Sequence, residues 1–151
     1  MGARREIERL LFDYCWGIDH GDFAFTASLF GEAGLYGLVG SGAARGAVQV
    51  LGMFEASTRR HDGVPRTRHV VTNVVIDVAD DGQSGTARSY VQVIHQPPST
   101  AGEPRHQIGP IVVGTYLDTV HLVDGSWQFA ERRMHLEMVG DLSTHLNPGF
   151  L

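Results

Sequence analysis

Two residues of this chain are suited by type and position to acid/base chemistry. Asp19 closes a stretch of helical periodicity, and His69 lies near the start of a β-rich run. A carboxylate beside an imidazole orients the ring and stabilises its protonated form, so the ring can act as a general base near neutral pH. Each residue alone is also consistent with a structural role, as an exposed helix-end acid or a hydrogen-bonded core histidine.

Other polar side chains are predicted to face the same interior. Strand periodicity places His69 on one face with Val71 and Asn73. It also places His95 and Tyr116 on apolar faces of the two strands that follow. A mainly apolar wall with a few titratable groups is typical of a small-molecule pocket. Asn73, His95 and Tyr116 are therefore candidate ligand-binding residues, although each is also compatible with a core position.

The sequence does not favour a metal or a nucleotide cofactor. None of the eight histidines forms a His-x-His or His-x-x-x-His pair, and Cys15 is the only cysteine. No glycine-rich phosphate loop is present. Asp19 and Asp22 suggest a carboxylate pair, but this spacing at a helix end is more typical of capping. We predict no metal and no cofactor.

Helical periodicity dominates the first part of the chain. Apolar residues recur on one face from Arg4 to about Ile18, which predicts an amphipathic helix. Gly21 is suited to end this helix and Asp22 to begin a second. The elements predicted next are a helix over 23–29, a strand over 33–39, a Gly/Ser/Ala turn, and a helix over 46–59.

The second half has the period and turn chemistry of an antiparallel meander. Asp80-Asp81-Gly82 and Asp124-Gly125 are hairpin turns, and residues 96–109 form a longer loop. The predicted strands are 68–78, 85–95, 110–123 and 126–137. Helices followed by consecutive strands indicate an α+β fold, with the helices on one face of a strongly curved sheet.

Composition limits the possible partners and compartment. The 151 residues, of which 42% are hydrophobic and 19% charged, suit one domain over 1–151. The formal net charge of -5 and the lack of a basic patch argue against nucleic-acid binding. No window has the roughly 18 to 20 apolar residues that cross a bilayer, and no secretory signal is visible. We expect no membrane partner, and a cytoplasmic location.

Three strings resemble the SnoaL-like branch of the nuclear transport factor two-like superfamily, which includes scytalone dehydratase, hexachlorocyclohexane dehydrochlorinase and ring-hydroxylating dioxygenase β subunits. They are Ile18–Phe23, Thr67–Asn73 and Asp124–Ala130. The resemblance covers most of the chain. It implies a cone-shaped α+β barrel, in which N-terminal helices pack on a strongly curved, mainly antiparallel sheet.

The resemblance also implies roles for particular residues. In the dehydratase and the dehydrochlorinase, an Asp after the first helix and a His opening the central strand form a catalytic dyad, which Asp19 and His69 match. The dehydratase's second pocket histidine is matched by His95, and Tyr36 is nearest to its tyrosine on the first short strand. Tyr14, on the apolar stripe of the first helix, completes the candidate ligand-binding residues.

Some positions depart from the family pattern. A second tyrosine of the dehydratase is replaced here by Ile18, and its pocket asparagine by Tyr116. The dehydrochlorinase's lysine upstream of the aspartate has no equivalent near Asp19. Neither specific reaction is therefore carried over.

These observations predict a cofactor-independent lyase or isomerase, of dehydratase or cyclase type, acting on a hydrophobic cyclic or polyketide-like small molecule. His69 would abstract a proton, Asp19 would orient His69, and Tyr36, His95 or Tyr116 would bind an oxygen. The alternatives are a non-catalytic β-type dioxygenase subunit and a small-molecule-binding module. Epoxide hydrolysis, which needs an Asp-Arg-Asp set, is disfavoured by the outward position of Arg88. We expect a homodimer or homotrimer formed through the open sheet, and a tail over 140–146 that closes the pocket or packs on a neighbouring subunit.

Overall fold

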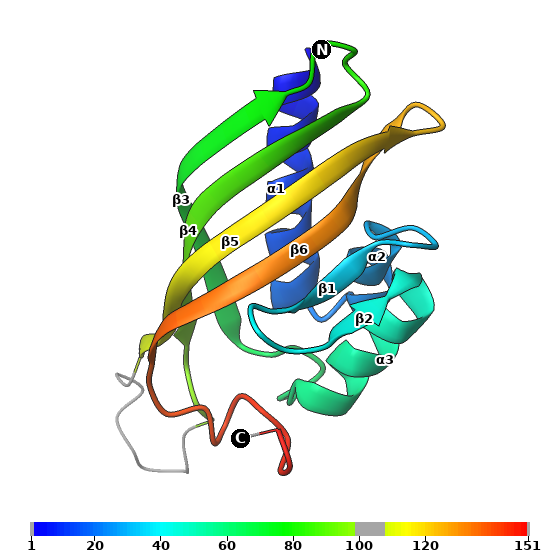
Figure 1. The fold of residues 1–151 in the computed structure, drawn as a ribbon. Helices are drawn as coiled ribbons and strands as arrows, with labels where there is room; N and C mark the ends of the chain where they lie inside the picture. Colours follow the sequence, from blue (N-terminus) through cyan, green and yellow to red (C-terminus); the bar gives the residue numbers. More distant parts are fainter. Residues whose placement is uncertain (1, 99–107, 151) are drawn as a thin grey trace.

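The computed structural model describes residues 2–98 and 108–150, and it is an α+β fold of helices packed on one mixed sheet (Figure 1). The three helices are α1 (Ala3–Asp19), α2 (Phe23–Ser28) and α3 (Gly46–Ser57). The six strands are β1 (Leu35–Leu38), β2 (Ala43–Arg45), β3 (Thr67–Val78), β4 (Ser84–His95), β5 (Gly109–Val123) and β6 (Ser126–Val139).

The first helix forms as its apolar stripe predicts, and that stripe is buried against the sheet. Its inward residues are Ile7, Leu10, Leu11, Tyr14, Cys15, Ile18 and Asp19. The helix stops because Gly21 adopts a left-handed conformation, with φ of 74°. Asp22 then caps α2 by accepting a hydrogen bond from the Phe25 amide at 3.0 Å. Asp19 and Asp22 therefore have different roles, and Asp22 is a helix cap.

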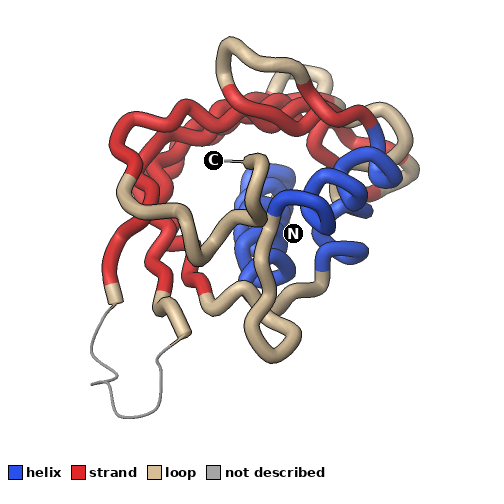
Figure 2. Tube along the Cα trace, turned by 90° about the horizontal axis from the view of Figure 1, so that it is seen from below, coloured by secondary structure: helices blue, strands red, loops and turns tan. Residues whose placement is uncertain are grey.

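The strands are ordered β2-β1-β6-β5-β4-β3 in a single sheet. The predicted meander from β3 to β6 is confirmed as antiparallel, while β1 pairs with β6 in parallel. Register shifts occur in β3/β4, β4/β5 and β5/β6. Because β-bulges bend strands and increase their twist, these irregularities curve the sheet. Figure 2 shows the strands as an arc that encloses the helices.

Two local predictions needed correction. The predicted Gly/Ser/Ala turn contains β2, which is too short to show periodicity in sequence and exists because it pairs with β1. The third helix ends at Ser57 and not at Arg59, because the next residue, Thr58, forms an antiparallel bridge with Leu146. The predicted loop over 96–109 lies largely outside the described residues. None of the described helices combines the length and apolar character that a bilayer crossing requires.

The core contains one fully buried cation. Arg132 has no exposed surface and donates two hydrogen bonds of 2.8 Å to the Asp118 carboxylate. Its guanidinium lies 4.3 Å from the ring centroid of Tyr14, 4.0 Å from that of Tyr116 and 4.3 Å from that of Phe129. Helix α1 and the sheet are thus joined by an ion pair enclosed in aromatic rings.

Candidate active site

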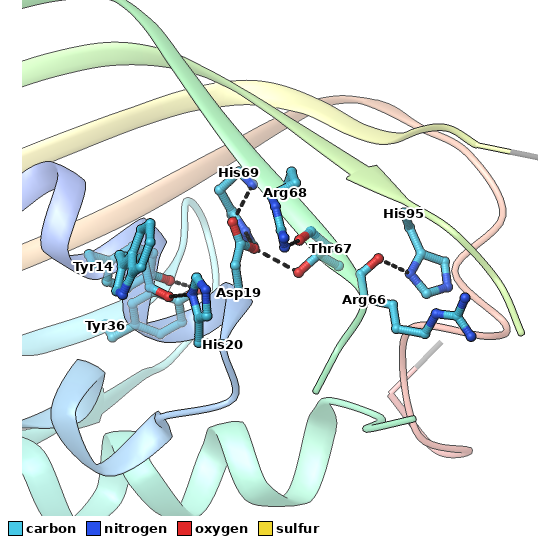
Figure 3. A network of polar contacts seen from close by, with 10 residues as sticks. Tyr14, Asp19, His20, Tyr36, Arg66, Thr67, Arg68, His69 and His95 are labelled. Carbon is cyan, nitrogen blue, oxygen red and sulfur yellow. Dashed lines mark hydrogen bonds and ion pairs between the residues drawn. The ribbon is translucent and has the colours of Figure 1, made fainter. Parts of the chain in front are cut away.

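Asp19 and His69 form a hydrogen-bonded pair where the end of α1 meets the start of β3 (Figure 3). The His69 Nδ1 atom lies 2.6 Å from Asp19 Oδ1. The side chains are only 9% and 6% exposed, respectively. Two further donors hold the carboxylate, because the Thr67 hydroxyl donates to Oδ1 at 2.7 Å and the His69 amide donates to Oδ2 at 2.8 Å. The first residues of β3, Thr67 and His69, therefore supply all three donors.

These donors determine the protonation states of the pair. Burial acts to raise the pKa of Asp19, but hydrogen bonds and charge from His69, with the Thr67 hydroxyl, lower it overall. Since the carboxylate is ionised and accepts at both oxygens, the proton between the two side chains belongs to His69 Nδ1. The neutral ring then has an unprotonated Nε2, which is the form required of a general base.

His69 of this dyad lines a cavity of about 580 Å³. The cavity lies between the helices and the concave face of the sheet, and its walls include Ile18, Met53, Phe54, Val93, Val112, Met134 and Leu136. Among the described residues that line it there is no Arg, Lys, Asp or Glu, and the histidines are His69 and His145. A second, surface groove of about 340 Å³ reaches the dyad from outside, between Phe12, Trp16 and Arg68.

Two of the predicted ligand-binding residues line this cavity. Tyr14 and Tyr36 come from α1 and β1, and the Tyr14 hydroxyl donates to the Tyr36 hydroxyl at 3.1 Å. Burial raises the pKa of both phenols, so both remain protonated near neutral pH. The pair can therefore offer a hydroxyl hydrogen to a ligand but cannot act as a base.

Asn73 does not line the cavity. It adopts a left-handed conformation, with φ of 55°, at the register shift between Thr72 and Val75. The extra residue of this bulge reverses the alternation, so Val71 and Val74 both face inward while Asn73 is exposed. A strict two-residue period carried through the bulge placed Asn73 on the wrong face.

His95 and Tyr116 face inward as predicted, but neither lines the cavity. His95 is 2% exposed, with Nδ1 3.3 Å from the Arg66 carbonyl oxygen and Nε2 3.0 Å from the Thr144 hydroxyl. Tyr116 lies against Arg132, and its hydroxyl has no hydrogen-bond partner among the described residues. Each packs against a ring that does line the cavity, since His95 contacts His145 and Tyr116 contacts Tyr14.

The C-terminal segment supplies residues that the sequence did not single out. Leu142, His145, Leu146 and Phe150 form part of the cavity wall. The predicted tail over 140–146 therefore closes one side of the pocket in this chain. No pattern in the sequence around His145 indicates that it lies at the pocket, because its position depends on contacts with α3 and β4.

The alternative sets of residues are not assembled. Arg88 is exposed on the convex side of β4 and Asp118 is paired with Arg132, so these residues do not place an Asp-Arg-Asp set at the cavity. Within the described ranges, no three His, Cys, Asp or Glu side chains are grouped so that they could hold a metal ion. Burial raises the pKa of Cys15 to about 12, so this thiol is not a nucleophile near neutral pH.

Comparison with solved structures supports the fold assignment. A candidate scytalone dehydratase from Novosphingobium aromaticivorans superposes with a TM-score of 0.73 and 29% identity, over 97% of this chain and 92% of that one. Rv3472, a protein of unknown function from Mycobacterium tuberculosis, gives a TM-score of 0.72 and 28% identity, over 89% of this chain and 71% of that one.

A more distant neighbour shares the fold alone. ActVI-ORFA from Streptomyces coelicolor gives a TM-score of 0.67 and 22% identity, over 90% of this chain and 98% of that one. No curated protein matches the sequence. The model of the SnoaL-like domain matches residues 1–133, which contain the dyad and all six strands up to the middle of β6. The chain belongs to the SnoaL-like family.

Proposed function

We propose that this protein is a cofactor-independent lyase or isomerase, of dehydratase or cyclase type, that acts on a hydrophobic cyclic or polyketide-like small molecule. The observation that carries the proposal is the 2.6 Å contact between Asp19 and the Nδ1 atom of His69, a residue that lines an apolar cavity. Such a pair holds a general base in a fixed orientation.

In the dehydratase form of the reaction, His69 Nε2 takes a proton from the carbon next to a ketone. The C–H electron pair forms a carbon–carbon double bond, and the bond to a β-hydroxyl group breaks. The departing hydroxide takes the proton back from the imidazolium and leaves as water. Asp19 stabilises the imidazolium between these steps, so no external acid, metal or electron carrier is required. In an isomerase, the same proton returns to a different carbon.

The cavity favours a neutral ligand with few polar atoms. Because no Arg or Lys stands among the described residues that line it, the cavity would leave a carboxylate or phosphate without a counter-ion from them. A volume of about 580 Å³ is in the range of small-molecule sites. The relative named as a candidate scytalone dehydratase, at 29% identity, is consistent with a cyclic hydroxy ketone as the substrate class.

A direct test uses 3-hydroxy-1-tetralone, a cyclic β-hydroxy ketone whose dehydration gives the absorbing product 1-naphthol. We expect the wild type to accelerate this reaction, and His69→Gln or Asp19→Asn to reduce the rate by about 10²- to 10⁴-fold. His121→Gln, at an exposed site on β5, is the matched control. In parallel, hydrogen–deuterium exchange next to the ketone of 1-tetralone isolates the proton-abstraction step.

If the wild type neither dehydrates the hydroxy ketone nor exchanges the ketone's protons faster than His69→Gln, acid/base catalysis of this class is contradicted. Saturable ligand binding without exchange would then favour the binding-module alternative. Failure to bind, together with stable association with a larger oxygenase subunit, would favour the β-type subunit.

We also propose that the chain forms a homodimer or homotrimer through the convex face of the sheet. Apolar side chains are exposed there on three adjacent strands, with Val70 40%, Tyr90 52% and Leu117 45% exposed. Exposed apolar side chains on adjacent strands are typical of a subunit interface.

A further inference from the structure

The dyad supplies the cavity with a base but not with a donor for a ligand oxygen. Asp19 accepts the Nδ1 hydrogen of His69, so the neutral ring presents an unprotonated Nε2. A ketone oxygen accepts hydrogen bonds only, and it loses its contacts with water when it enters an apolar cavity. Recognition of such a ligand therefore needs a second group that carries a hydrogen.

The C-terminal segment brings one such group to the cavity and holds it firmly. The Arg59 amide donates to the His145 carbonyl at 2.8 Å, and the Asn147 amide donates to the Ser57 carbonyl at 2.8 Å. The preceding residue, Thr144, is held by two histidines, because His61 Nε2 donates to its carbonyl at 2.9 Å and its hydroxyl bonds His95 at 3.0 Å. The His145 backbone is thus fixed on both sides.

The His145 ring lies at the wall of the cavity that His69 also lines. It packs at 5.7 Å from the His95 ring, and its Nδ1 atom is shielded from solvent with no hydrogen-bond partner among the described residues. Its Nε2 atom is not sealed in this way. Because an N–H buried without an acceptor is costly, the tautomer with the hydrogen on Nε2 is favoured.

The surroundings of His145 also keep the ring neutral. Burial, together with the nearby imidazoles of His69, His95 and His61, lowers the pKa of His145 to about 4 against an opposing effect of Asp19. His145 is therefore a weak base near neutral pH. A neutral imidazole can still polarise a carbonyl by donating a hydrogen bond.

We propose that His145 is the hydrogen-bond donor of this cavity and that its Nε2–H binds a carbonyl oxygen of the ligand while His69 acts on an adjacent carbon. The proposal deepens the proposed function, on which its second half rests. Binding of the oxygen by His145 is a separate claim, because it requires a ketone but no turnover.

The competing donor is Tyr36. The Tyr14 hydroxyl donates to the Tyr36 oxygen, so the Tyr36 hydrogen remains available on the same cavity wall. Variants of both residues are therefore needed to assign the donor.

The test compares 1-tetralone with tetralin, which has the same two rings without the oxygen. Calorimetric titration measures the affinity of each probe, and the infrared carbonyl stretch of bound 1-tetralone reports directly on hydrogen-bond donation. We expect the wild type to bind the ketone about 3- to 10-fold more tightly than tetralin and to shift the stretch to lower frequency. His145→Phe should lose both effects without weakening tetralin binding, whereas His145→Gln, which keeps an N–H donor, should retain them.

Retention of the infrared shift in His145→Phe, or its loss in Tyr36→Phe alone, would overturn the proposal. If His145→Phe does not fold, nitrogen-15 spectra of the wild type decide the question, because the His145 Nε2–H signal must respond to 1-tetralone and not to tetralin. A ketone bound by His145 in a protein that never exchanges its α-protons would refute the proposed function and leave this inference intact.

Discussion

At the scale of single residues, the site depends on how three donors hold one carboxylate. Thr67 and the backbone of His69 fix both oxygens of Asp19, so the third donor, the His69 ring, has only one way to approach. The first residues of β3 therefore fix the orientation of the base. A loss of one donor should loosen the pair without breaking it.

The variant Thr67→Val tests this arrangement with little change in side-chain volume. Loss of the hydroxyl bond should raise the pKa of Asp19, because that bond favours the charged carboxylate. We expect a reduction of about 3- to 10-fold in the rate of ketone proton exchange. Carbon-13 NMR of the Asp19 carboxyl and the exchange assay measure the two effects.

The control is Thr58→Val, which changes a threonine at the same cavity wall that has no side-chain bond to the dyad. Equal effects of the two variants would mean that cavity polarity, and not the Asp19 contact, sets the rate.

The outcome for single residues shows where sequence reasoning succeeds. Asp19 and His69 were predicted because their positions follow from helix and strand periodicity together with the family resemblance. Asn73 was misplaced because a bulge is decided by the pairing of two strands and not by one strand's pattern. His145 was missed because a short tail without periodicity takes its place only through tertiary hydrogen bonds.

At the scale of elements, the turn between α1 and α2 positions the end of the helix that carries Asp19. Gly21 has φ of 74°, and a Cβ atom there would lie 2.6 Å from the carbonyl oxygen of Gly63. The close approach links this turn to the loop that precedes β3. The dyad is therefore assembled from two segments that contact each other through a glycine.

We expect Gly21→Ala to lower the free energy of unfolding by about 2–4 kcal/mol, since it adds a clash to an unfavourable backbone conformation. Gly82→Ala is the matched control, because Gly82 has φ of 66° but its Cβ would contact nothing within 4 Å. It should cost about 1 kcal/mol. Urea unfolding of both variants measures the difference, and equal losses would show that the contact with Gly63 is unimportant.

The C-terminal segment should respond to acid, because burial keeps neutral both His145, which belongs to it, and His95, which bonds the Thr144 hydroxyl. The pKa of His145 is about 4 and that of His95 is also lowered, both from an ordinary value of 6.5. The unfolded chain therefore takes up protons before the folded one does. The contribution of these two histidines to the free energy of unfolding is therefore fully present well above pH 6.5 and declines as the pH falls toward 4.

Unfolding free energies measured from pH 7.5 to 4.5 should show this decline, with His145 contributing roughly 2 kcal/mol of it. His145→Gln should flatten the profile, and the exposed His121→Gln should not. Hydrogen exchange of the Asn147 amide should rise over the same interval, because this bond holds the segment to α3. An identical profile in His145→Gln would contradict the assignment.

Periodicity predicted the large elements and failed only where an element is defined by its partner. The amphipathic stripe of α1 and the alternation of β4 and β5 come from burial, which leaves a direct record in the sequence. Strand β2 has three residues and no such record. The curvature that makes the cavity arises from bulges, so sequence patterning predicts the sheet but not its bend.

At the scale of the whole molecule, the Arg132–Asp118 pair is the main polar connection inside the core. We expect Arg132→Met to lower the free energy of unfolding by about 3–5 kcal/mol, because Asp118 would be left buried without its partner. The double variant Arg132→Met/Asp118→Leu should recover most of that loss. A urea double-mutant cycle measures the coupling, with Arg9→Met in the exposed Arg9–Asp13 pair as the control.

The convex sheet face gives a prediction about assembly. Tyr90→Arg should shift the proposed dimer or trimer toward monomer, because it places a charge among exposed apolar side chains. Val48→Arg, on α3 at a residue that is 85% exposed, changes charge equally away from that face and should leave the mass unchanged. Sedimentation or light scattering distinguishes the two, and a monomeric wild type would exclude this interface.

The central position of β6 has a consequence for how the chain acquires its structure. Strand β6 pairs with β5 on one side and β1 on the other, although β1 precedes it by about ninety residues. As the chain emerges from the ribosome, the contact between Tyr14 of α1 and Phe129 of β6 and the pairing of β1 with β6 cannot form until β6 has been synthesised. Sheet closure is then a late, long-range step, so this protein should fold slowly for its size and depend on chaperones during synthesis.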